Sequence, residues 1–183
     1  MVRVCFLAFL FAGSVHAQQR SPMAPADAPS QLRIAARGEP GQALRITGLV
    51  VDADGAPVRN ASLYVYQTDA RGYYTTDAMN SDRQARIHGW LRADRNGRFE
   101  IATIRPGSYP SAQAPQHVHF VVNATGFTQR IFEIVFDDDP FVNERVRTEA
   151  ARANSVFSIC RPEREDQGQH CTERVVLTRA SGR

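Results

Sequence analysis

The chain has 183 residues, of which 43% are hydrophobic and 22% charged, and its formal net charge is +3. This length is sufficient for one substantial core, and the composition is that of an ordinary soluble globular domain. All 22 basic residues are arginines, and they are scattered along the chain. Because no basic run is present, we expect no nucleic-acid partner.

The first 17 residues have the features of a signal peptide. Arg3 precedes a short apolar run, and small residues lead up to Ala17, as they do before a cleavage site. The apolar run is too short to span a bilayer; a buried N-terminal strand is the alternative. We therefore expect export to the periplasm or beyond, with cleavage after Ala17 and no membrane association of the mature chain.

The cysteines agree with an oxidising compartment. Removal of the signal peptide would take away Cys5 and leave Cys160 and Cys171, an even number. A bridge between them would close a loop of about a dozen residues and contribute roughly 2–4 kcal/mol to stability. Two unrelated thiols are the alternative.

The remaining sequence predicts one domain after a flexible arm. Residues 18–40 are rich in Pro, Ala and Gln and lack periodicity, so we assign them to the arm, and residues 41–183 to the domain. Short apolar runs separated by Gly, Asp and Pro turns predict an antiparallel β-sandwich. Strands are expected at residues 44–52, 61–67, 98–104, 116–122 and 130–136, and a closing hairpin at residues 155–159 and 174–178 with the cysteines in its loop. One short helix is expected between Asp139 and Ala153, with Pro140 at its first position.

Two histidines in one predicted strand are the main candidates for a functional site. Side chains along a strand point alternately to opposite faces, so His117 and His119 share one face while Val118 and Phe120 share the other. A tyrosine, Tyr109, precedes them in a Pro-Gly-x-Tyr-Pro turn. These residues supply three potential metal ligands.

A fourth ligand is expected from the loop after residues 61–67, where the residues alone leave Tyr73 and Tyr74 open. Phenolate is a hard, anionic donor, and two phenolates favour a trivalent ion, whereas a zinc site draws more on histidine, cysteine or carboxylate ligands. Tyrosine ordinarily titrates near pH 10, so a phenolate at neutral pH implies a strongly charged metal beside it. Ferric iron meets these requirements.

Five motifs in order give the sequence a recognisable pattern. They are Gly48-x-Val50-x-Asp52-x-x-Gly55-x-Pro57, Tyr66-Gln67-x-Asp69-x-x-Gly72-x-Tyr74, Thr103-Ile104-x-Pro106-Gly107-x-Tyr109-Pro110, Pro115-x-His117-x-His119-Phe120 and Phe136-x-x-Asp139-Pro140. This pattern resembles the intradiol ring-cleavage dioxygenases, most closely their protocatechuate dioxygenase branch. The resemblance covers roughly residues 40 to 142, and five ordered motifs are far more specific than any one of them.

The resemblance implies a site and a reaction. It implies that Tyr74, Tyr109, His117 and His119 are the ligands of a non-haem ferric ion, and the family's Gly-x-Tyr spacing selects Tyr74 over its neighbour. It further implies that O₂ cleaves a catechol-type ring between its two hydroxylated carbons to give a muconate-type diacid. Tyr74 and Tyr109 would be the catalytic residues, and an oligomer is compatible with the family.

Two positions depart from the family pattern. Ala114 stands where an arginine is usual and Glu133 where a glutamine is usual, so Arg105 and Arg130 are the candidates for the missing cation. Two alternatives to the enzyme are an iron-binding member of the family without dioxygenase activity and a metal-free binding sandwich. The second is suggested because residues 48–61 also resemble transthyretin-like and carboxypeptidase regulatory-like modules.

Overall fold

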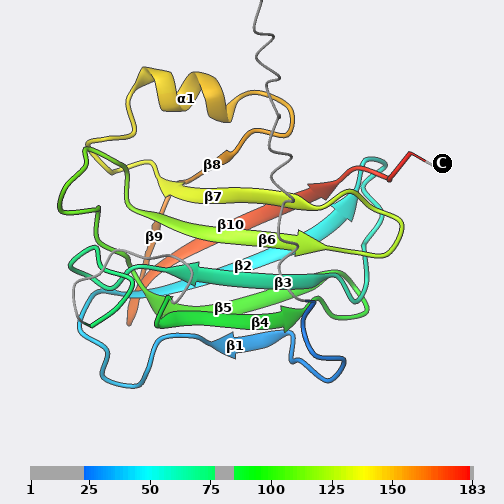
Figure 1. The fold of residues 1–183 in the computed structure, drawn as a ribbon, viewed down its shortest axis with the longest axis horizontal. Coiled ribbons are helices and arrows are strands. Elements are labelled where there is room, and N and C mark those ends of the chain that lie inside the picture. Colours follow the sequence, from blue (N-terminus) through cyan, green and yellow to red (C-terminus); the bar gives the residue numbers. More distant parts are fainter. Residues whose placement is uncertain (1–22, 77–84, 182–183) are drawn as a thin grey trace, which may run out of the picture.

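The computed structural model describes residues 23–76 and 85–181 and shows two five-stranded sheets packed face to face (Figure 1). One sheet has the strand order β1-β5-β2-β10-β9 and the other β4-β3-β6-β7-β8. The strands are β1 (Gln31–Arg33), β2 (Ala43–Asp52), β3 (Ser62–Gln67), β4 (Ile87–Arg92), β5 (Arg98–Ile104), β6 (His117–Asn123), β7 (Arg130–Phe136), β8 (Phe157–Cys160), β9 (Glu163–Glu165) and β10 (Gly168–Leu177). One short helix, α1 (Glu144–Ala150), lies among the described residues. The predicted all-β sandwich with a short helix is confirmed.

The core lies between the sheets because the central strands turn alternate side chains inward, where they are buried. In β6, Val118, Phe120 and Val122 are fully buried, and in β3 Leu63 and Val65 are as well. Each such side chain contributes about 1.5–3 kcal/mol when it leaves water. The inward face of β6 therefore fixes the strand firmly, and its histidines are left for the opposite face.

The end of the chain is connected differently from the predicted hairpin. Strand β8 pairs with β7 in one sheet, whereas β10 pairs in parallel with β2 in the other. The hairpin prediction was wrong because β9, a strand without an apolar pattern, intervenes and is itself the hairpin partner of β10. The predicted disulfide between Cys160 and Cys171 is present, with 5.8 Å between the Cα atoms, and it joins the two sheets.

Part of the segment assigned to the N-terminal arm packs on the sandwich. Strand β1 pairs in parallel with β5, and Ile34 and Ala35 are buried. A Cβ atom at Gly89 of β4 would lie 2.6 Å from side-chain atoms of Leu32 and Ile34, so this glycine makes room for the segment. The packed domain therefore begins before residue 41, while the predicted signal peptide, residues 1–17, lies outside the described residues.

The helix begins later than predicted. Asn143 is its N-cap and accepts a hydrogen bond from the Val146 N–H, so Pro140 lies in the preceding turn. Asp139 stabilises that turn instead, because its carboxylate accepts a hydrogen bond from the Phe141 N–H at 2.8 Å. Among the described residues, no helix has the length and apolar character needed to cross a membrane.

Candidate metal centre

The two histidines lie on the outer face of the β4-β3-β6-β7-β8 sheet, at the beginning of β6. Their neighbours Val118 and Phe120 belong to the core, which confirms the predicted division of faces. The loops that follow β3 and precede β6 gather at the same end of this sheet (Figure 1). The fold thus brings the histidines and both tyrosine-bearing loops to one place.

Four donor atoms converge there. The hydroxyl oxygens of Tyr74 and Tyr109 are 2.5 Å apart. The Tyr74 hydroxyl is 2.7 Å from Nε2 of His119, and the Tyr109 hydroxyl is 2.9 Å from Nε2 of His117. The structure therefore brings together all four predicted site residues. The neighbouring Tyr73 is not in the cluster; its ring lies under the Arg71 guanidinium, 5.7 Å from it.

Both imidazoles present Nε2 to the tyrosines because Nδ1 is engaged elsewhere. Nδ1 of His117 lies 2.6 Å from the carbonyl oxygen of Pro115, to which it donates. Nδ1 of His119 lies 3.3 Å from a carboxylate oxygen of Glu133. Acceptors at both Nδ1 atoms favour the tautomer whose Nε2 lone pair is available to a metal.

Burial keeps the His119 imidazole suited to metal binding. The pKa of His119 is lowered to about 3, mainly by burial and secondly by the nearby charge of His117. Burial likewise raises the pKa of the Glu133 carboxyl, against the opposing effect of His117. His119 is therefore neutral at physiological pH, as a metal-binding imidazole must be.

The Tyr74 loop is held by a buried carboxylate and a glycine. Asp69, at the end of β3, accepts hydrogen bonds from the N–H groups of Arg71 and Tyr73, at 2.8 and 3.1 Å. Gly72 has a φ of +88°, and a Cβ atom there would lie 1.9 Å from the carbonyl oxygen of Ser108. Only glycine allows this approach, which places the two tyrosine-bearing loops in contact.

The Tyr109 loop is anchored to β3 from the other side. The Thr68 hydroxyl donates to the Gly107 carbonyl at 2.9 Å, and the Gly107 N–H donates to the Asp69 carbonyl at 2.8 Å. The fully buried Gln67 side chain donates to the Ile104 carbonyl at 2.8 Å. Residues of the segment that leads to Tyr74 therefore also position the loop that carries Tyr109.

Neither arginine that we considered as a replacement at Ala114 faces the donor atoms. Arg105 binds the Asp138 carboxylate and donates to Gln116 at 2.6 Å, so it anchors the residue before His117. Arg130 lies over the ring of the buried Phe132, on the core side of β7. Both guanidinium groups therefore make contacts that stabilise the fold and not the donor cluster.

Strand register gives His119 two neighbours whose proximity was not predicted from the sequence. Tyr66 of β3 and Glu133 of β7 lie directly opposite His119. The Tyr66 ring stacks on the imidazole with centroids 4.3 Å apart and planes 7° apart. His117, His119 and Glu133 also form a group whose ligand atoms lie within 4.8 Å of one another. Strand alternation in the sequence placed His117 and His119 on one face, but it could not show that Tyr66 and Glu133 pair with His119 across neighbouring strands.

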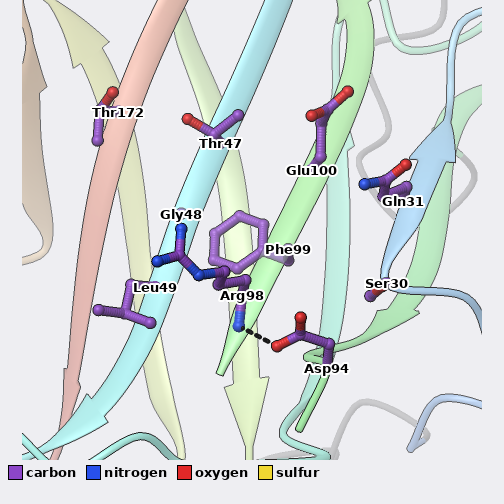
Figure 2. Close-up of a pocket in the computed structure, with 10 residues that line it drawn as sticks. All are labelled: Ser30, Gln31, Thr47, Gly48, Leu49, Asp94, Arg98, Phe99, Glu100 and Thr172. Carbon is purple, nitrogen blue, oxygen red and sulfur yellow. Dashed lines mark hydrogen bonds between the residues drawn. The ribbon is translucent and has the colours of Figure 1, made fainter. Parts of the chain in front are cut away.

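A separate groove of about 320 Å³ lies on the other sheet (Figure 2). Its lining comes from β1, β5, β2 and β10 and the turn at Asp94, whose carboxylate accepts a hydrogen bond from the Arg98 N–H. It shares no residue with the donor cluster, which lies on the β4-β3-β6-β7-β8 sheet.

Comparison with known proteins places the chain in a family. A family model described as "Dioxygenase" matches residues 16–176. The protocatechuate 3,4-dioxygenase beta chain of Burkholderia cepacia is 34% identical over 116 residues, 57% of this chain and 49% of the relative. The hydroxyquinol 1,2-dioxygenase of Rhizobium sp. (strain MTP-10005) is 25% identical over 135 residues, 65% of this chain and 43% of the relative. The chain thus spans less than half the length of these curated relatives.

Solved structures agree on the fold. The dioxygenase domain of a dioxygenase carbohydrate-binding protein fusion from Streptomyces sp. SirexAA-E aligns with a TM-score of 0.64 at 24% identity, covering 89% of this chain and 97% of that one. Catechol 1,2-dioxygenase from Pseudomonas arvilla C-1 aligns with a TM-score of 0.67 at 21% identity, covering 89% of this chain and 62% of that one. With the family match over most of its length, the chain belongs to the intradiol ring-cleavage dioxygenase family.

Proposed function

We propose that this protein is a ferric-iron-dependent dioxygenase that cleaves a catechol-type ring between its two hydroxylated carbons. The observation that carries the proposal is a cluster of two phenol oxygens and two imidazole Nε2 atoms, joined by three successive contacts of 2.5, 2.7 and 2.9 Å. The reaction would insert both atoms of O₂, break one carbon–carbon bond and give a muconate-type diacid without a further reductant. Membership of the family supports this reaction class.

The donor set fits ferric iron. Tyr74, Tyr109, His117 and His119 would hold the ion, since two phenolates suit a trivalent metal and both imidazoles direct Nε2 at the phenol oxygens. The chemistry that ferric iron supplies when bound is Lewis-acid activation of a chelated catechol towards O₂. The protein contributes the fixed donor geometry, which three anchored segments maintain: the loop after β3, the loop before β6, and β6 itself.

The two tyrosines have different surroundings, which suggests different roles. Tyr74 is 3% exposed, whereas Tyr109 is half-buried on a loop. A ligand that must move aside for a substrate is better placed on such a loop. We therefore assign to the Tyr109 oxygen the uptake of a proton from a catechol hydroxyl, and to Tyr74 the permanent anchoring of the site.

Iron binding can be tested separately from turnover. After loading with ferric iron, the protein should show a visible tyrosinate-to-iron charge-transfer band and a red colour. Tyr109→Phe and Tyr74→Phe should each weaken or shift the band, whereas Tyr73→Phe, which changes the adjacent ring outside the cluster, should leave it unchanged. A protein that takes up no ferric iron, or binds it without a visible band, would contradict the proposed ligand set.

An iron-binding protein without dioxygenase activity is the second candidate. The observation that favours it is the engagement of Arg105 and Arg130 elsewhere in the fold, so that neither compensates for Ala114. Oxygen uptake by the iron-loaded protein with a panel of catechols, with and without a carboxylate substituent, separates the two. Uptake matched by diacid formation supports the enzyme, and a coloured protein without uptake supports the second candidate.

We also propose that the chain is exported. The signal-peptide features of residues 1–17 and the Cys160–Cys171 bridge, which requires an oxidising compartment, support this proposal. Mass spectrometry of the protein from cell fractions should find a mature chain beginning at Gln18 outside the cytoplasm. An intact chain confined to the cytoplasm would contradict it.

A further inference from the structure

We infer that Glu133 is a positioning residue for His119, and that its carboxylate strengthens the binding of a metal at Nε2 of that imidazole. The inference deepens the proposed function and rests on it. It concerns a residue outside the four-donor set.

Strand register places Glu133 beside His119. Tyr66, His119 and Glu133 lie directly opposite one another on the three adjacent strands β3, β6 and β7. Side chains opposite one another on the same face of a sheet are held within contact distance. The neighbours of His119 are therefore fixed by the sheet itself and not by a loop.

The His119 imidazole is held in one orientation. Tyr66 stacks on one face of the ring, with planes 7° apart, and so fixes the ring plane. In that plane Nε2 is 2.7 Å from the Tyr74 hydroxyl, while Nδ1 is 3.3 Å from a Glu133 carboxylate oxygen. The carboxylate and the metal position thus lie at the two nitrogens of one ring.

The two histidines differ in the group that lies beside Nδ1. Nδ1 of His117 donates to a neutral backbone carbonyl, that of Pro115, whereas the acceptor at His119 is a carboxylate. A carboxylate at one imidazole nitrogen raises the donor strength of the other. The two histidines are therefore unequal ligands, and His119 is the stronger donor.

In the part of the chain that the structure describes, the Glu133 carboxylate pairs with His119 and has no second ion-pair partner. The nearest candidate cations serve other groups, since Arg105 binds Asp138 and Arg130 lies on the opposite face of the sheet. We therefore assign to the Glu133 carboxylate the role of partner to Nδ1 of His119.

The test compares Glu133→Gln and Glu133→Ala with the unchanged protein. Glu133→Gln retains an oxygen acceptor of the same shape and removes only the charge, whereas Glu133→Ala removes the acceptor as well. Glu173→Gln is the matched control, because it neutralises a buried carboxylate that is bonded to Ser158 on the core side of β10. Two quantities are measured: the ferric-iron affinity in competition with citrate, and the wavelength of the tyrosinate charge-transfer band.

We expect Glu133→Ala to weaken iron binding about 10- to 100-fold, as loss of such partners does, and Glu133→Gln to weaken it less. Both variants should move the band to longer wavelength, because a weaker imidazole donor leaves the iron easier to reduce; Glu173→Gln should change neither quantity. Wild-type affinity and an unmoved band in both Glu133 variants would overturn the inference. If the unchanged protein binds no iron, the proposed function fails first, so the two failures are distinguishable.

Discussion

Substitution of Gly72 by alanine tests whether contact between the two tyrosine-bearing loops assembles the metal centre. The added Cβ atom would lie 1.9 Å from the Ser108 carbonyl oxygen and 2.8 Å from its carbon. Ordinary contact begins at 3.4 Å, so the loops would have to separate by about 1.5 Å. Ser108 directly precedes Tyr109, and the tyrosine oxygens are only 2.5 Å apart. This separation would therefore pull the donor atoms apart.

The expected size of the effect has two parts. Gly72 has a φ of +88°. An alanine held at such a positive φ costs about 1–2 kcal/mol at any position in a protein. Displacement of the donors is the part specific to this position, and misplacement by about 1 Å costs about 100-fold in rate. We expect Gly72→Ala to weaken ferric-iron binding at least about tenfold and to lower kcat/KM about 100-fold.

Gly126→Ala is the matched control. Gly126 has nearly the same φ, +83°, but a Cβ atom there meets nothing within 4 Å. The cost of the positive φ should therefore be similar in the two variants, and Gly126→Ala should show that cost alone in urea unfolding. Only Gly72→Ala should lose iron in a chelator competition assay. Equal iron affinity and equal turnover in the two variants would refute the reasoning.

Three further outcomes follow from the buried polar and sulfur groups. Asp69→Ala should lower the unfolding free energy by about 2–4 kcal/mol in urea titrations, because two backbone N–H groups lose a charged acceptor. Burial raises the pKa of the Asp69 carboxyl, but its hydrogen bonds, first that from the Tyr73 N–H, outweigh burial and lower the pKa overall. The stabilisation by the Asp69 carboxylate is therefore present at neutral pH and is lost as the pH falls below the ordinary aspartate range. Burial raises the pKa of the Glu173 carboxyl in the folded protein. The ionised carboxylate therefore destabilises the fold increasingly as the pH rises above the pKa that Glu173 has in the unfolded chain. Glu173→Gln should accordingly raise the melting temperature at pH 7 but not at acid pH. Joint replacement of Cys160 and Cys171 by serine should lower the unfolding free energy by roughly 3 kcal/mol, measured against the oxidised wild type; melting temperatures that do not change would show that the bridge contributes nothing.

The residues of the site were predictable because they follow local rules. Strand alternation alone placed His117 and His119 on one face, and the structure has them there, opposite Val118 and Phe120. The Cys160–Cys171 bridge followed from counting cysteines after the expected cleavage. The choice between Tyr73 and Tyr74 needed the family's spacing, because the loop is irregular and alternation does not apply there.

What the sequence did not reveal depends on pairing between distant strands. The stack of Tyr66 on His119 and the position of Glu133 follow from the register of β3, β6 and β7, which no local pattern determines. The same limit explains the wrong hairpin, since β8 and β10 have strand-like sequences but enter different sheets. Helix α1 begins later than predicted because Asn143 caps it. Asn143 is a local helix-start signal, and the prediction relied on Pro140 instead.

The most direct test of the central proposal is the fate of labelled dioxygen. The iron-loaded protein is allowed to react with catechol under ¹⁸O₂, and the product is analysed by mass spectrometry. The proposed function predicts a muconate-type diacid that carries one ¹⁸O atom in each of its two new carboxyl groups. A product cleaved outside the two hydroxylated carbons, or unlabelled oxidised catechol without ring cleavage, would contradict it.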